Sequence, residues 1–250
     1  MILALTLALA CTDTSSNTDE GVDSPGEEPE WMAPTGGVVT VETRDGVTLE
    51  ADYLPSATQG PAIVLLHMIP PGNTRADWPD SFQEALGAQG WSVMAVDRRG
   101  AGGSGGDAVD AYQGEAGKYD VEACVKKLVD DGYAQVAIIG ASNGTTSMVD
   151  YAVWAEGEGL PVPLGLAYMS GGAYTESQNQ MESVPQVPMA FLYPPNEAGW
   201  SEGNQDLDPG TWRWHSYENG DHGTRLFGTP DAAQVESDLL AFTATLLPDD

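Results

Sequence analysis

The chain has 250 residues, and its 38 Asp and Glu against nine Lys and Arg give a formal net charge of −29. This length suits one domain with a short appendage, and a hydrophobic fraction of 41% is sufficient for a sizeable core. So strong a negative charge argues against nucleic acid as a partner, because phosphate backbones are bound by Lys and Arg.

The N-terminus carries a short apolar segment followed by a cysteine. Residues 1–10 are too few to span a bilayer, and Cys11 follows them directly. Residues 7–11 (Leu-Ala-Leu-Ala-Cys) resemble a bacterial lipoprotein signal. Two features differ from such signals: Ala8 stands where they usually have leucine, three residues before the cysteine, and the positively charged segment that begins them is missing. The resemblance implies a signal over 1–11 and an exported protein held at the cell envelope by a lipid on Cys11, its only membrane contact. An ordinary secretory signal is the alternative.

The segment after the cysteine is predicted to be a disordered tether. Residues 12–30 contain seven acidic residues, no basic ones and many Ser, Thr and Pro. Such a composition cannot bury enough apolar area to fold. We therefore expect a tether over 12–36 and a folded domain over 37–250.

The folded part begins with a predicted hairpin and two buried elements. Residues 38–43 and 47–53 alternate in polarity, and the turn at 44–46 (Arg-Asp-Gly) joins them. The apolar run 62–66 predicts a strand that is covered on both faces. A helix is predicted over 78–88 and the next strand over 91–96.

A glycine-rich loop follows and contains two motifs that we reject. Residues 102–106 match Gly-x-Ser-x-Gly, but the preceding strand stops at Asp97, so nothing rigid aims Ser104. Residues 100–105 match the dinucleotide fingerprint Gly-x-Gly-x-x-Gly, but no amphipathic helix begins there and no acidic strand end follows at the required distance. We expect no cofactor.

The most informative segment is a second Gly-x-Ser-x-Gly at residues 140–144. A helix over 119–130 leads into an apolar run that ends in this motif, and a helix is predicted over 145–154. Strand, tight turn and helix in that order form a nucleophile elbow, which points the serine hydroxyl out of the sheet edge. Side chains at the two glycines would collide with the neighbouring strand and helix. We therefore predict that Ser142 is a nucleophile.

The remaining elements complete an α/β pattern. Strands are predicted at 164–169, 188–193 and 212–217, and a closing helix is predicted to begin at Thr229 and Pro230. A hairpin followed by alternating strands and helices implies a mostly parallel sheet with helices on both faces. About 18 residues separate the strands that end near 169 and begin near 188, so the lid is minimal.

A nucleophilic serine needs a base, and histidine suits that role at neutral pH. The chain has three: His67, His215 and His222. His215 lies within a predicted strand, and His67 ends an apolar run upstream of the serine. His222 lies in a glycine-flanked loop between the last strand and the closing helix, which can fold over the serine. We assign the base to His222.

Together these segments resemble the α/β-hydrolase family over residues 37–250. The resemblance is carried by residues 65–72, 97–104, the elbow and Asp221-His222-Gly223. The layout is similar to compact, dienelactone-hydrolase-like esterases, and a serine in place of that subgroup's frequent cysteine favours simple esterase chemistry. The resemblance implies an α/β-hydrolase fold and a triad in the order Ser, acid, His.

The family's acid follows the strand that precedes the histidine loop. Glu197 stands at that place, after a double proline that is atypical of the family. Glu202, Asp206 and Asp208 remain alternatives. The acid orients the imidazole and stabilises its cation.

A tetrahedral oxyanion needs two N–H donors. The family implies that one is the backbone amide of Asn143, beside the nucleophile. The other comes from the loop after residue 66, where the family usually has His-Gly and this chain has Met68 in place of the glycine. Ile69 is the expected donor and Met68 the second choice. His67 is then expected to shape this loop, and residues 97–100 to form the family's structural Asp-x-Arg-Gly turn.

These features predict a serine hydrolase that cleaves carboxylic esters with small acyl groups through an acyl-enzyme on Ser142. The alternatives are a binding lipoprotein with a degenerate site, or an acyltransferase or thioesterase. A small-molecule ester is the expected partner. No metal is expected, because the chain has no His-Glu-x-x-His and no Cys/His cluster.

Overall fold

The computed structural model describes residues 31–248 apart from residue 180. Cys11, the predicted signal and the predicted tether up to residue 30 lie outside the described residues. Trp31 already belongs to the domain: its Nε1 donates to the Asp131 carbonyl at 2.9 Å, and its ring packs edge-on against Tyr133. Within the described part, no helix is long and apolar enough to cross a membrane.

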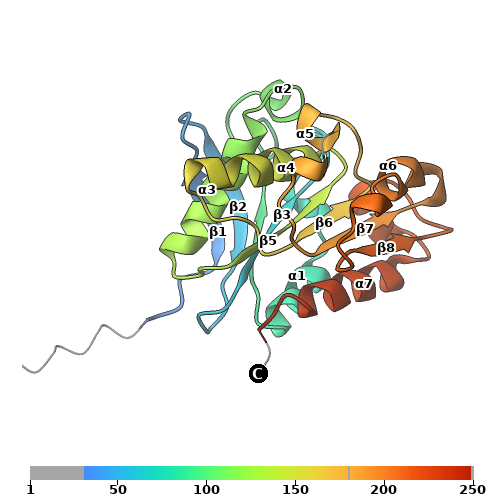
Figure 1. Cartoon of the computed structure of the whole chain (residues 1–250). Coiled ribbons are helices and arrows are strands. Elements are labelled where there is room, and N and C mark those ends of the chain that lie inside the picture. The colour runs from blue at the N-terminus through green and yellow to red at the C-terminus, as the bar shows by residue number, and fades with distance from the viewer. Residues whose placement is uncertain (1–30, 180, 249–250) are drawn as a thin grey trace, which may run out of the picture. The chain divides into compact units, whose positions relative to one another are not determined.

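An eight-stranded sheet with the order β1-β2-β4-β3-β5-β6-β7-β8 forms the centre of the domain (Figure 1). Only β2 is antiparallel to its neighbours; all other adjacent strands are parallel. This confirms the mostly parallel sheet. The strand bounds are β1 (Gly37–Glu42), β2 (Thr48–Leu54), β3 (Ala62–Leu66), β4 (Ser92–Val96), β5 (Val136–Ala141), β6 (Leu166–Met169), β7 (Met189–Tyr193) and β8 (Arg213–Ser216).

Four helices of nine residues or more were predicted from the sequence, and three short ones were not. The short helices, of four or five residues, are too brief to show an amphipathic pattern. The closing helix begins at Ala232 rather than at Thr229, after a 3₁₀ turn over Gly223–Gly228. The helix bounds are α1 (Asp80–Ala88), α2 (Ala108–Tyr112), α3 (Gly117–Asp130), α4 (Gly144–Ala155), α5 (Glu176–Asn179), α6 (Ala198–Glu202) and α7 (Ala232–Ala244).

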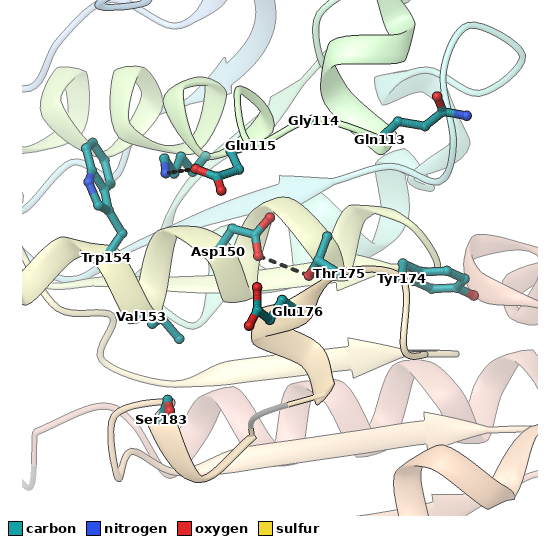
Figure 2. Close-up of a pocket in the computed structure, with 11 residues that line it drawn as sticks. Gln113, Gly114, Glu115, Asp150, Val153, Trp154, Tyr174, Thr175, Glu176 and Ser183 are labelled. Atoms are coloured by element: carbon teal, nitrogen blue, oxygen red, sulfur yellow. Dashed lines mark hydrogen bonds and ion pairs between the residues drawn. The ribbon is translucent and has the colours of Figure 1, made fainter.

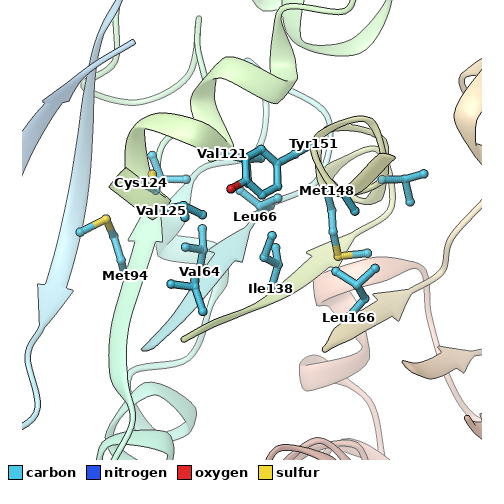
Figure 3. Close-up of a cluster of buried hydrophobic side chains, with 14 of the residues drawn as sticks. Val64, Leu66, Met94, Val121, Cys124, Val125, Ile138, Met148, Tyr151 and Leu166 are labelled. Carbon is cyan, nitrogen blue, oxygen red and sulfur yellow. The ribbon is translucent and has the colours of Figure 1, made fainter. Parts of the chain in front are cut away.

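Both faces of the sheet are covered, as the continuous apolar run of β3 predicted. All five residues of β3 are buried. Val64 and Leu66 point into the cluster beneath α3 and α4 (Figure 3). Ile63 and Leu65 point into the cluster beneath α1 and α7. The alternation of side chains along a strand therefore places two hydrophobic cores on either side of one sheet.

The sheet order places the candidate site. β3 pairs with β4 on one side and with β5 on the other, so the chain changes direction across the sheet between these strands. Ligands of open α/β sheets bind outside the carboxyl ends of the strands at such a switch point. His67 directly follows β3, and Ser142 directly follows β5 and donates its backbone N–H to the Met169 carbonyl of β6 at 2.7 Å.

Candidate active site

Ser142 lies on a strained turn between β5 and α4. Its φ is +49°, in the left-handed region that residues other than glycine rarely adopt. A Cβ at Gly140 would lie 2.9 Å from the Thr145 backbone, and one at Gly144 would lie 2.4 Å from the Leu66 carbonyl oxygen. Backbone atoms of a packed sheet and helix cannot yield to such contacts. The two glycines are therefore a steric requirement of this turn.

The structure brings Ser142, His222 and Glu197 together. Ser142 Oγ lies 2.5 Å from His222 Nε2, and His222 Nδ1 lies 2.8 and 2.9 Å from the two carboxylate oxygens of Glu197. Because a carboxylate only accepts hydrogen bonds, Nδ1 carries the proton and Nε2 accepts from the serine hydroxyl. The serine is 6% exposed, and the His222 and Glu197 side chains are 26% and 27% exposed.

The His222 loop is fixed at Gly223, next to the histidine. The Gly223 N–H donates to the buried Ser170 Oγ at 3.0 Å, and the His222 N–H donates to Asp221 Oδ1 at 2.6 Å. Gly223 has φ +60°, and a Cβ there would lie 2.5 Å from the Met68 sulfur. Ser170 follows β6 and has φ +55°. Sequence reasoning missed it; its only local signal is a serine between a strand end and two glycines.

The other carboxylates considered as the acid have different environments. Glu202 Oε1 accepts a hydrogen bond from the Tyr193 hydroxyl at 3.1 Å. Asp208 Oδ1 accepts three backbone N–H groups at 2.7 to 3.0 Å and so caps the turn before β8. Asp206 lies in a 3₁₀ turn. Of these four carboxylates, Glu197 is the one hydrogen-bonded to the histidine imidazole.

The other two histidines have other partners. His215 Nδ1 lies 3.2 Å from the Asp238 carboxylate of α7. His67 is fully buried; its Nε2 accepts the Arg98 backbone N–H at 2.8 Å, and its Nδ1 donates to the Met68 carbonyl at 2.8 Å. Burial, and then the adjacent Arg98 guanidinium, lower the pKa of His67 to about 3. The ring is therefore neutral at physiological pH and serves to hold the loop after β3.

The residues considered as oxyanion donors lie on two adjacent loops. Asn143 stands at the N-cap position of α4, where backbone N–H groups lack intrahelical partners. Met68 and Ile69 follow β3; the Met68 side chain is buried and that of Ile69 is 45% exposed. The loops approach closely, since a Cβ at Gly144 would lie 2.6 Å from the His67 carbonyl oxygen. Amides from both loops are thus available beside the elbow.

The glycine-rich loop after β4 has a structural role. Ser104 Oγ donates to the Asp97 carbonyl at 2.5 Å and accepts the Glu50 N–H at 2.9 Å, so this serine ties the loop to the sheet. Arg99 is buried and forms an ion pair with the buried Asp120 of α3 at 2.7 Å. The loop residues 97–104 are thus held by hydrogen bonds and an ion pair within the fold.

A cavity of about 580 Å³ lies beside α4, lined by residues of the α2–α3 loop, α4 and the segment after β6 (Figure 2). Its lining includes Glu115, Asp150, Trp154 and Tyr174, but neither the candidate serine nor the candidate histidine. Asp150 accepts a hydrogen bond from the Thr175 hydroxyl at 3.0 Å. Although the lining is acidic, no group of His, Cys, Asp and Glu in the described residues could hold a metal ion.

Comparison with known families gives one match, which covers the central part of the chain. A family described as serine aminopeptidase, S33, matches residues 63–186. This range contains Ser142 and ends before Glu197 and His222. No curated protein matches the chain.

Solved structures of similar shape share little sequence with the chain. An esterase from Pyrococcus furiosus is 17% identical, with a TM-score of 0.69 over 86% of this chain and 92% of that chain. A dienelactone hydrolase from Anabaena variabilis is 14% identical, with a TM-score of 0.66 over 86% of this chain and 99% of that chain. An esterase from a Rhodococcus species is 16% identical, with a TM-score of 0.61 over 84% of this chain and 99% of that chain. The chain therefore has the α/β-hydrolase fold, as its sequence predicted.

Proposed function

We propose that the chain is a serine hydrolase that cleaves carboxylic esters through an acyl-enzyme on Ser142. The observation that carries this proposal is the line of hydrogen bonds from Ser142 Oγ through His222 to Glu197, at 2.5 and 2.8 Å. A serine hydroxyl becomes an effective nucleophile when an adjacent imidazole accepts its proton and a carboxylate stabilises the imidazolium. The α/β-hydrolase fold and the esterases among structures of similar shape support the same reaction class.

In the first half-reaction, Ser142 Oγ attacks the ester carbonyl carbon while His222 Nε2 takes the hydroxyl proton. The carbonyl π electrons move to the oxygen, and we infer that the N–H groups of Asn143 and Ile69, with Met68 as the alternative, bind this oxyanion. The N-terminus of the twelve-residue helix α4 adds a positive dipole at the same place. The oxyanion then collapses, the bond to the alcohol oxygen breaks, and the alcohol leaves with the proton from the imidazolium.

In the second half-reaction, water attacks the acyl-enzyme carbonyl while His222 accepts one of its protons. The bond to Ser142 Oγ breaks, the serine regains a proton from the imidazolium, and the carboxylic acid leaves. Glu197 holds the proton on Nδ1 throughout. An alcohol or thiol in place of water would give acyl transfer, and a thiol leaving group would make the reaction that of a thioesterase. The same three residues would serve in each case.

The segment between β6 and β7 supports a small acyl group. Its described residues contain only α5, of four residues, and a 3₁₀ turn over Met181–Ser183. This length leaves no room for a lid domain that could enclose a long chain. We therefore propose short-chain esters as substrates rather than aggregated lipid.

Two departures from the family pattern, the double proline before Glu197 and Met68 in place of glycine, would favour a degenerate binding protein if they disrupted the site. The double proline precedes a 3₁₀ turn over Pro195–Glu197, and the carboxylate at its end still lies within hydrogen-bond distance of His222. Met68 is buried and removes no polar group from the site. Neither departure interrupts the hydrogen-bonded line, which supports the enzyme over the binding protein.

Labelling with a fluorophosphonate probe tests the nucleophile. We expect the wild-type protein and Ser237→Ala, an exposed serine of α7, to be labelled equally, and Ser142→Ala to remain unlabelled. An unlabelled wild type would favour the binding protein. Label retained in the Ser142 variant would place the nucleophile elsewhere.

Hydrolysis of p-nitrophenyl esters of increasing chain length tests the substrate class and the acid. We expect the highest kcat/KM with acetate or butyrate, and a decrease in kcat of about 10²- to 10⁴-fold in Glu197→Gln. Glu202→Gln is the matched control, because that carboxylate bonds to Tyr193 instead of the histidine. Equal losses in the two variants would contradict the assignment of Glu197.

We also propose, from the sequence alone, that the protein is exported and held at the cell envelope by a lipid on Cys11. Metabolic labelling with radioactive palmitate tests this proposal in the intact cell. We expect label in the wild-type protein and none in Cys11→Ser. An unlabelled wild type released into the medium would indicate a secreted protein instead.

A further inference from the structure

Arg98 is a fully buried cation directly behind the candidate site. Its Nη1 donates to the Met68 carbonyl at 3.3 Å and to Asn143 Oδ1 at 3.0 Å. Its Nη2 donates to the Ala111 carbonyl and to Ser147 Oγ, both at 2.8 Å. Nη1 also donates to the His67 carbonyl at 3.5 Å. All five acceptors are electrically neutral, and Nε has no hydrogen-bond partner among the described residues.

Asp120 and Asp150 attract the Arg98 guanidinium electrostatically, but no carboxylate of the described residues forms an ion pair with it. Asp120, on the neighbouring helix α3, forms its ion pair with Arg99 instead. Burial lowers the pKa of Arg98 to about 10, so the guanidinium is still protonated at neutral pH. A buried charge that contacts only neutral groups costs folding free energy. The buried guanidinium of Arg98 therefore lowers the stability of the fold, which suggests that it serves another purpose behind the candidate site.

The Met68 carbonyl links Arg98 to one of the oxyanion donors. This oxygen accepts from Arg98 Nη1 and also from His67 Nδ1, at 2.8 Å. Its peptide unit continues into the N–H of Ile69, and the only cis bond of the described residues is at Pro70–Pro71. In a planar trans peptide the C=O and N–H point in opposite directions. The Ile69 N–H is therefore directed away from Arg98, and two donors on the carbonyl polarise it.

The same nitrogen of Arg98 holds the other donor residue. Nη1 binds the side chain of Asn143, whose backbone N–H is the second amide proposed for the oxyanion. One guanidinium nitrogen thus connects the loop after β3 with the loop after β5.

We propose that Arg98 is a positioning residue of the oxyanion hole, which joins its two donor loops and places a positive charge behind the developing oxyanion. This inference rests on the proposed function, because it requires a tetrahedral intermediate on Ser142. An interaction that strengthens as the oxyanion forms lowers the barrier of the chemical step more than it tightens substrate binding. Its loss should therefore lower kcat and weaken tetrahedral adducts, with little change in KM.

The test compares Arg98→Met with Ser147→Ala. The first variant removes the charge and all three contacts of Nη1. The second removes only a contact of Nη2, on the other side of the same guanidinium, and is the matched control. Three quantities are measured on the full chain: kcat and KM for p-nitrophenyl acetate, the Ki of an aryl trifluoromethyl ketone that forms a tetrahedral adduct with the serine, and stability in urea.

For Arg98→Met we expect kcat to fall about 10- to 100-fold and the Ki to rise by a similar factor, with KM within about threefold of wild type. Ser147→Ala should keep kcat and Ki within about threefold even where its stability in urea is lower. A purely structural role would change stability in both variants and leave the Ki of the folded fraction unchanged. A folded Arg98→Met with wild-type kcat and Ki overturns the inference, as does an equal loss of kcat in both variants.

If Arg98→Met does not fold, Asn143→Ala decides the question, because it removes one acceptor of Nη1 and keeps the backbone N–H. We expect a rise in the Ki of the ketone there as well, and an unchanged Ki overturns the inference. Fluorophosphonate labelling of the wild type distinguishes a failure of the proposed function from a failure of the role assigned to Arg98. A labelled, active wild type with an unaffected Arg98→Met overturns the role of Arg98 alone, whereas an unlabelled, inactive wild type overturns the proposed function and the inference with it.

Discussion

The neutral imidazole of His67 predicts a defined loss of stability in acid. The ring is fully buried, and a proton on Nε2 would face the Arg98 N–H and put a second positive charge beside the guanidinium. Burial first, and then that charge, lower the pKa of His67 to about 3, whereas an imidazole in an unfolded chain has a pKa of about 6.5. Between these values the unfolded chain binds a proton that the folded chain does not. The stabilisation is therefore complete above pH 6.5 and is lost progressively as the pH falls toward 3.

The magnitude follows from the two pKa values. One proton contributes about 1.4 kcal/mol per pH unit within this window. Lowering the pH from 7 to about 4.5 should reduce the free energy of unfolding by about 2.5 kcal/mol through His67 alone. The carboxylates of so acidic a chain add their own pH dependence. The quantity to compare is therefore the difference between the wild-type protein and a variant that lacks this imidazole.

Urea unfolding of the wild type and of His67→Gln, at pH 7 and at about pH 4.5, measures that difference. The wild-type advantage over the variant should shrink by about 2.5 kcal/mol on acidification. An NMR titration of the three imidazoles, assigned with His215→Gln and His222→Gln, provides an independent readout. The His67 signal should stay at its neutral position down to about pH 4.5. A midpoint near 6.5 for His67, or an advantage independent of pH, would refute the reasoning.

Three further outcomes are expected. Gly144→Ala should abolish activity and strongly lower the melting temperature, because its Cβ would lie 2.4 Å from the Leu66 carbonyl oxygen. Gly157→Ala is the control: its Cβ would have no heavy atom within 4 Å, so this variant should melt like the wild type. Asp120→Asn should lower the free energy of unfolding in urea by about 1–3 kcal/mol, because the buried Arg99 guanidinium loses its buried partner and keeps only Asp45, whose side chain is 34% exposed, and an unchanged free energy would contradict this. Raising NaCl from about 0.1 M to about 1 M should raise the melting temperature, because salt screens the self-repulsion of a chain with net charge −29, and a decrease would show that repulsion does not limit stability.

Local patterns in the sequence were sufficient for the fold and for the elbow. The strand, turn and helix around Ser142 lie within residues 136–155, and the glycines on either side meet backbone atoms of adjacent elements. The continuous apolar run of β3 predicted burial on both faces, and the structure shows it. Such features depend on side-chain periodicity and sterics over a few residues, which are legible in one chain. The short helices α2, α5 and α6 lack a measurable period, so the sequence was silent about them.

The sequence by itself therefore determined the class of the fold and the serine at its elbow, and only the tertiary structure decided which distant side chains meet there. His222 is 80 residues from Ser142 and 25 from Glu197. All four candidate carboxylates follow β7 and look alike in the sequence, and the path of one loop brings a single one to the imidazole. Arg98 was expected only in a structural turn, because its partners come from the loops after β3 and β5 and from the helices α2 and α4. Hydrogen bonds act over about 3 Å, so their partners are set by strand order and loop path, which local periodicity does not encode.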